Sequence, residues 1–282
     1  MAVKYADGFI PEIWEASVLR TYEDKLIANK ISWDKSSAVL KYGDTIHFNG
    51  LSDPTVTGSY SGTLSYETLV DSQVTLLVDQ QNTYAFLVDD IEQAMANVDL
   101  KGSQAARAGF QLQKTADAYV LGATTAAQAG STITDASLDT TTVLSVFSQA
   151  ARKLDEQNVP MGEKWIVVSP WVREKLILAG VVHQINDGTN GGGGLKWATY
   201  NDLDIYVSTN LVNATSESSA TGCLAGSYRA IGFAQSILKS RMQESKDAFA
   251  YYCSGLMVYG TKVIFPNELI NLQLTYAAET AI

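Results

Sequence analysis

The 282-residue sequence has very few of the side chains that bind transition metals or form disulfide frameworks. It contains two cysteines, Cys223 and Cys253, and two histidines, His47 and His183. The cysteines lie 30 residues apart, and none of the four residues has a spacing typical of a zinc or iron site. We therefore expect reduced, structural thiols, no bound metal and no cofactor.

Positive charge is also scarce. Lysine and arginine total 20 against 30 aspartates and glutamates, so the formal net charge is −10, and no run of basic residues occurs. A protein that grips nucleic acid needs a basic surface to neutralise phosphates, so we expect no direct hold on DNA or RNA. Charged residues make up 18% of the chain, where about 25% is typical. This favours a surface partly covered by partners, although a polar, uncharged surface explains the composition equally well.

Long apolar runs are absent as well. No stretch of 18 unbroken apolar residues exists, and residues 1–20 lack the basic start and apolar segment of a signal peptide. We expect a soluble protein without a membrane span that stays in the cytoplasm in which it is made.

The sequence contains no recognisable catalytic motif either. The segment GSYSG at 58–62 has tyrosine where a nucleophile elbow needs serine, and the run 255–262 has threonine and lysine in reverse order for a phosphate-binding loop. The glycine tract 191–194 precedes no helix start, and Asp202 and Asp204 lack further ligands for a metal. We predict no enzymatic activity and assign no catalytic, cofactor-binding or metal-binding residue. Residues distant in sequence can still meet in a fold.

The first 80 residues predict a helix followed by an arm. Residues 8–31 have Pro11 at a first helical position and apolar residues on one face, which indicates an amphipathic helix. The segments 42–48 and 72–80 have strand character, and the polar segment between them is too long for a tight turn. We predict a two-stranded arm, with an ordinary surface hairpin as the alternative.

A long helix is predicted next. Asp99 can cap a helix that runs to about Leu121, after a shorter helix capped by Asp89 or Asp90. Small or apolar residues recur along the long helix at intervals of three or four: Ala105, Gly109, Leu112, Ala116 and Tyr119. We expect this stripe, with Gly102 and Gly109, to pack closely against a sheet.

The second half indicates an α/β unit at 131–236. We predict a linker at 127–137, then a helix capped by Ser137. One face of that helix carries Val143, Phe147, Ala150 and Leu154. Further elements are expected in the order strand at 165–168, helix ending at Gly180, and strands at 203–209 and 228–237.

The aromatic segment 251–270 predicts a long strand, in which Gly255 and Gly260 allow a bend or a close approach. Several segments, in their shared order, resemble the major capsid proteins of tailed bacteriophages, which have the Hong Kong 97-like fold. They are IPEIWEASVL (10–19), KYGDTIHFNG (41–50), VTLLVDQQNTYAFLVDDIEQAMANVDL (74–100), WIVVSPWVREKL (165–176) and GLMVYGTKVIFPNEL (255–269).

The resemblance implies an α+β fold whose parts follow one another along the chain. They are an N-terminal arm at 1–40, an extended β-hairpin loop at 41–79, a peripheral domain with a long spine helix at 80–130, an axial α/β domain at 131–236, and returning strands of the peripheral domain at 237–282. The segment 251–270 is then expected to lie in the peripheral sheet under the spine helix. An ordinary core strand without an assembly role is the alternative.

The function implied by the resemblance is structural. Such a protein self-assembles into hexamers and pentamers that form an icosahedral head around double-stranded DNA, which it encloses without sequence-specific binding. It is located in the virion and is assembled in the cytoplasm of the bacterial host. The implied partners are copies of the same chain, a portal protein and a scaffolding protein, with a decoration protein as a further candidate.

Two other functions remain open from the sequence. One is a cellular nanocompartment shell of the same fold that encloses a cargo protein. The other is a hydrolase or binding protein of α/β type with a site built from distant residues, which the long polar arm disfavours.

The sequence also departs from some members of the family. It shows no long N-terminal helical extension and no cleavable propeptide, so we expect a separate scaffolding protein or none. In some relatives a lysine of the extended loop is joined covalently to an asparagine elsewhere. Residues 44–79 contain no lysine, so we expect no such crosslink from this loop.

Overall fold

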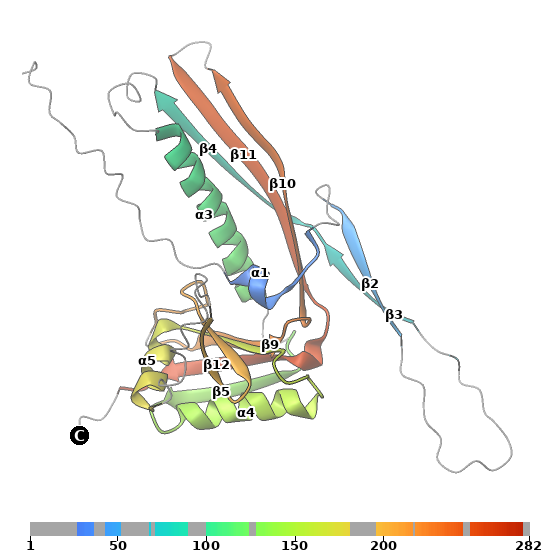
Figure 1. Ribbon diagram of the computed structural model, residues 1–282, viewed down its shortest axis with the longest axis vertical. Helices are drawn as coiled ribbons and strands as arrows, with labels where there is room; N and C mark the ends of the chain where they lie inside the picture. Colours follow the sequence, from blue (N-terminus) through green and yellow to red (C-terminus); the bar gives the residue numbers. More distant parts are fainter. Residues whose placement is uncertain are drawn as a thin grey trace, which may run out of the picture.

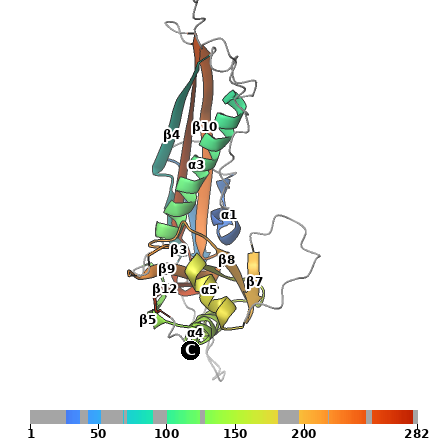
Figure 2. The same ribbon diagram turned by 90° about the vertical axis from the view of Figure 1, so that its left-hand side faces the viewer.

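The computed structural model describes residues 27–36, 43–51, 68, 71–89, 100–123, 128–180, 196–216, 218–244 and 249–278. These residues form an elongated molecule in which a long four-stranded sheet stands on a six-stranded sheet (Figure 1). A separate two-stranded sheet projects to one side. A long helix runs beside the four-stranded sheet, and shorter helices lie around the six-stranded one (Figures 1 and 2).

The strand order is β1-β10-β11-β4 in the long sheet, β5-β12-β9-β6-β8-β7 in the six-stranded sheet, and β2-β3 in the arm. The strands are β1 Trp33–Asp34, β2 Thr45–Leu51, β3 Asp71–Leu77, β4 Gln80–Asp89, β5 Ser131–Leu138, β6 Lys164–Val168, β7 Lys196–Tyr200, β8 Leu203–Val207, β9 Thr221–Ser227, β10 Ile231–Glu244, β11 Ala250–Val263 and β12 Leu269–Tyr276. The helices are α1 Ala28–Ile31, α3 Leu100–Ala123, α4 Val143–Glu156 and α5 Pro170–Leu178, with a 3-10 turn at Pro266–Glu268.

The long sheet is built from an antiparallel ribbon with one covered face. β10 and β11 pair along their whole length, with a register shift between Ile237 and Lys239. Burial alternates along β4, which is typical of a strand with one face packed and one face open. On the packed side Tyr119 of α3 meets Tyr259 of β11 edge to face, with 5.4 Å between the ring centroids. This arrangement confirms the predicted α+β class.

The six-stranded sheet has helices on both faces. All five residues of its central strand β6 are buried, so this strand is apolar throughout rather than alternating. The predicted apolar face of α4 is confirmed, because Val143, Phe147, Ala150 and Leu154 are all fully buried. Helix α1 and the end of α3 lie on the side of the sheet opposite α4 (Figure 1).

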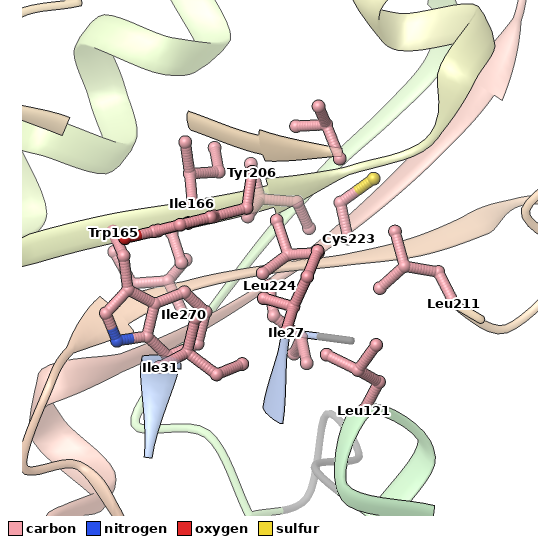
Figure 3. Packing of buried hydrophobic residues seen from close by; sticks show 14 of the residues in the cluster. Ile27, Ile31, Leu121, Trp165, Ile166, Tyr206, Leu211, Cys223, Leu224 and Ile270 are labelled. Carbon is pink, nitrogen blue, oxygen red and sulfur yellow. The ribbon is translucent and has the colours of Figure 1, made fainter. Parts of the chain in front are cut away.

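One continuous apolar cluster joins the two sheets. Ile27, just before α1, and Ile31, at its end, reach into this cluster beside Leu121 of α3, and all three are almost completely buried. Leu224 and Ile270 of the six-stranded sheet lie against them (Figure 3). The two sheets are therefore parts of one folded body.

The glycines of β11 confirm the expected close approach, but the approaching groups differ from the expected helix. A Cβ atom on Gly255 would lie 2.2 Å from the ring of Tyr84 in β4, and one on Gly260 would lie 2.3 Å from the carbonyl oxygen of Leu77. The long helix shows the opposite result at Gly109, where a Cβ atom would meet nothing within 4 Å. Close packing at Gly109 was therefore wrongly predicted. Ala105 is exposed too, so only the later part of the stripe is buried.

Several local predictions are confirmed. The arm strands pair as β2 and β3, the long helix spans Leu100–Ala123, and the strand, Ser-Pro turn and helix at 164–178 occur as expected. Gly180 follows that helix with a φ of 82°, a conformation that suits glycine. The predicted helix at 8–31, apart from its last residues in and next to α1, and the predicted short helix after Asp89 lie outside the described residues.

Two local predictions are wrong for one reason. Residues 131–138 form the strand β5 rather than a linker, because β5 pairs in parallel with the apolar strand β12 and buries Ile133 and Leu138. The following helix consequently begins at Val143, and the turn that leads into it is held by Asp139 rather than Ser137. The carboxylate of Asp139 accepts hydrogen bonds from the Thr141 hydroxyl and from the Thr142 and Thr141 amides, and these bonds lower its pKa to about 2.

The predicted division between the two sheets also needs correction. β12 lies in the six-stranded sheet, so the prediction that residues 237–282 all return to the long sheet is wrong for this strand. β10 begins at Ile231, inside the range 131–236 that was predicted for the other unit. Both strands follow short turns that carry the chain between sheets, and such turns leave little compositional signal.

Two glycine substitutions should change stability in opposite directions. Gly255→Ala should lower the free energy of unfolding by about 1–3 kcal/mol, because the new methyl group displaces the Tyr84 ring. Gly109→Ala should raise it by up to about 1 kcal/mol, because alanine favours a helix and meets no neighbour. Denaturant unfolding of both variants measures this, and equal effects would contradict the packing at Gly255.

Candidate assembly surfaces

The described residues do not gather a catalytic or metal-binding site. No group of three or more histidine, cysteine or acidic side chains suited to a metal occurs in this part of the chain. Burial raises the pKa of the Cys223 thiol to about 12, and both Cys223 and Cys253 are buried and free. His47 is exposed on the arm beside Thr75, with 3.2 Å between Nδ1 and Oγ1, whereas His183 lies outside the described residues.

The acidic pair considered in the sequence has a structural role. Asp202 lies in the β7–β8 turn with a φ of 62°. Asp204 is bound by Lys196, at 2.6 Å, and accepts a hydrogen bond from the Tyr228 hydroxyl at 3.0 Å. Burial and the neighbouring Tyr206 hydroxyl raise the pKa of Tyr228 well above its usual value. Through Asp204 this cluster ties β7, β8 and the β9–β10 turn together.

Two hollows of about 290 and 300 Å³ lie on the surface of the described residues. The first lies at the base of the arm and includes Asp79, Tyr119 and Lys262. The second lies on the long sheet and includes Ser254 and Arg241. Among the described residues, neither hollow is lined by a histidine: Thr75 lines the first, but its neighbour His47 is not part of that lining, so neither has the geometry of a hydrolase site. No helix in the described part of the chain is both long and apolar enough to cross a membrane.

The base of the projecting arm packs against the long sheet through a separate apolar contact. Leu76 and Val78 of the arm and Ala234 and Val258 of the long sheet are all fully buried in a small cluster of their own. The chain crosses the sheet here at Gly260, whose missing side chain makes room for the backbone at Leu77 and Val78. A glycine in the middle of a strand indicated a close approach at this position. The sequence did not indicate that the approaching group is the backbone at the end of the arm.

A second contact holds the arm from the side. Trp33 of β1 packs against Phe48 of β2, with ring centroids 5.5 Å apart, and Lys35 lies over the Trp33 ring at 4.0 Å. Trp33 is the residue that joins the N-terminal segment to the arm, and the sequence did not single it out. The base of the arm is thus fixed by apolar contacts on two sides, while its opposite, polar face stays exposed.

The open face of the long sheet carries exposed apolar side chains. Leu87 of β4 and Tyr252 of β11 are Cα partners, and they are 54% and 51% exposed. Phe249, at the tip of the β10–β11 hairpin, is 82% exposed. Neighbouring large apolar groups left open on a sheet are typical of a surface that a partner covers.

The junction between the two sheets contains an ion pair. Arg229, in the β9–β10 turn, makes a two-pronged contact with Glu268, in the β11–β12 turn, with its shortest bond at 2.7 Å. Ser227 donates a further hydrogen bond to Glu268 at 2.6 Å. The hydrogen bond to Glu268, followed by its negative charge, raises the pKa of the Arg229 guanidinium despite partial burial.

Removing one partner of this ion pair should be costly. Glu268 is buried, so Glu268→Gln should lower the free energy of unfolding by about 1–3 kcal/mol by leaving Arg229 without its carboxylate. Glu156→Gln is the matched control, because its pair with Arg152 is exposed on both sides and should change stability by less than about 0.5 kcal/mol. Thermal or denaturant unfolding measures both, and equal losses would show that burial adds nothing at the junction.

Comparison with known proteins bears on the fold. No protein-family model matches the chain, and no curated protein matches it. A structure from Mycobacterium phage Che8 is 22% identical, with a TM-score of 0.73, and the match covers 94% of this chain and 97% of that one. The capsid of cyanophage P-SCSP1u is 17% identical, with a TM-score of 0.74 and coverage of 96% and 94%.

The capsid of Ralstonia phage GP4 matches over 100% of this chain and 99% of its own, with 14% identity and a TM-score of 0.69. These matches cover both sheets, because nearly the whole chain is aligned in each. The chain therefore has the Hong Kong 97-like fold of bacteriophage capsid structures, as its resemblance to that family predicted.

Proposed function

We propose that the chain is the major capsid protein of a bacteriophage, a structural rather than catalytic protein. The observation that carries the proposal is the match to phage capsid structures over 94–100% of the chain, which leaves no large part of the molecule for a different function. Fold alone does not fix function, so the exposed surfaces provide the second argument.

The shape of the molecule suits a shell subunit. An elongated body with a projecting arm and an open apolar sheet face offers several separate surfaces to neighbours. Permanent assemblies of this kind bury roughly 2,000 Å² or more at an interface. We propose hexamers and pentamers that close into an icosahedral head, in which closure by symmetry satisfies every copy of these surfaces.

The remaining expectations fit this proposal. The net charge of −10 suits a container that encloses double-stranded DNA without adhering to it. We retain 1–40 as the N-terminal arm and 41–79 as the extended loop, and we assign the long sheet to the peripheral domain and the six-stranded sheet to the axial domain. Assembly would take place in the bacterial host cytoplasm, with portal and scaffolding proteins and a decoration protein as further partners.

Size-exclusion chromatography with light scattering, followed by electron microscopy, tests the proposal. We expect closed particles, or free hexamers and pentamers, from the purified chain with its scaffolding protein when one is required. A monomer or dimer that persists at high concentration would contradict it. Nucleic acid inside the particles supports a phage head, whereas a protein cargo would assign the chain to a nanocompartment instead.

A pair of substitutions tests the open sheet face. Tyr252→Glu should reduce the assembled fraction about tenfold or more. Each interface between subunits would bury one new carboxylate, and burying an unpaired charge costs free energy. Met161→Glu is the control, since Met161 is 81% exposed in the turn before β6, away from the long sheet. Particle yield and the thermal midpoint of each variant are measured together. Equal yields at unchanged stability would exclude this face as an interface.

A further inference from the structure

Asp117 occupies an unusual position on α3. Its side chain is 1% exposed, and its carboxylate contacts two segments that are distant in sequence. Oδ1 accepts hydrogen bonds from the backbone amides of Ile27, at 2.8 Å, and Ala28, at 2.6 Å. Oδ2 accepts one from Nδ2 of Asn210, at 2.8 Å, in the loop that follows β8. One buried carboxylate thus joins the N-terminal segment, the long helix and the six-stranded unit.

The physical chemistry makes this contact cooperative. A buried carboxylate is tolerated only while donors replace the water that it has lost. If residues 27 and 28 move away, Oδ1 loses both of these donors, and the carboxylate is left short of hydrogen bonds. The N-terminal segment therefore cannot leave its place while α3 and the Asn210 loop keep theirs.

Residues 27–36, which we call the root, contact both sheets. Ile27 and Ile31 are fully buried against the six-stranded sheet (Figure 3). Further along, the Lys35 amide donates to the carbonyl oxygen of Phe233 at 2.8 Å, and the Ser36 hydroxyl accepts from the Gln235 amide at 3.2 Å. The root therefore contacts the long sheet at one end and the six-stranded core at the other.

We propose that Asp117 is a positioning residue that couples the root to the packing of the two units, so that displacement of the root and rearrangement of the junction occur together. In a shell this coupling transmits a pull on the N-terminal arm into the shape of the subunit. That consequence rests on the proposed capsid function, whereas the coupling itself is a property of the isolated chain.

Hydrogen exchange with the full-length chain tests the coupling. Asn210→Ala does not alter the Ile27 or Ala28 amide directly, but it removes the side chain that donates to Asp117 Oδ2. It should speed hydrogen exchange at the Ile27 and Ala28 amides roughly tenfold or more. Asp117→Asn should do the same more strongly. Asp139→Asn is the matched control, because Asp139 also accepts backbone amides but only from its own loop, and it should leave the root unchanged.

The outcomes separate the coupling from a simple local cap. If Asn210→Ala leaves exchange at Ile27 and Ala28 at the wild-type rate while Asp117→Asn speeds it, Asp117 is a local cap and the proposal is overturned. Faster exchange spread equally over β6 and β9 would indicate general destabilisation and would also overturn it. A confined increase in the root and in the Asn210 loop supports the coupling.

The assembly experiment distinguishes this inference from the proposed function. If wild-type protein forms particles, Asp117→Asn should broaden their diameter distribution by electron microscopy, while Asp139→Asn should not. A uniform population from Asp117→Asn would overturn the role in a shell. If wild-type protein forms no particles, the capsid proposal fails, and the exchange result alone decides the coupling.

Discussion

Two crossings of the chain run side by side between the long sheet and the six-stranded sheet, and the rest of the structure depends on their register. The first is the β9–β10 turn, and the second is the β11–β12 turn. The amides of Ile264 and Phe265 both donate to the carbonyl oxygen of Ala230, and Arg229 is paired with Glu268. Because each crossing ends in paired strands on both sides, a slip of one residue would misplace side chains in both sheets at once.

This constraint explains why two sheets of different shape behave as one body. A third crossing, from α3 to β5, is held where the Gly130 amide donates to the Pro266 carbonyl oxygen at 2.6 Å. A Cβ atom on Gly130 would lie 2.7 Å from the backbone of Asn267, so the close approach needs glycine. The apolar cluster around α1 fills the remaining space.

The sequence predicted elements well where side-chain periodicity was strong. The apolar face of α4, the Ser-Pro turn before α5 and the alternation of Leu76, in β3, with Val78, just after it, follow from residue type and spacing alone. It failed at β5, because the threonines and serines of this strand are typical of a linker and only the pairing with β12 makes it a strand. It also failed at Gly109, because helix periodicity shows which residues share a face but not how far along the helix a partner extends.

The sequence by itself determined the mixed composition of helices and strands, the amphipathic faces, the two-stranded arm and the scarcity of groups for metal binding or catalysis, because these depend on residue type and local spacing. Only the tertiary structure decided that Gly260 faces the arm and that Arg229 meets Glu268. It alone also decided that Asp117 accepts hydrogen bonds from the amides of Ile27 and Ala28, which lie 90 and 89 positions earlier in the chain. Such contacts depend on how distant segments are brought together, and that is fixed by the packing of the whole chain rather than by local preference.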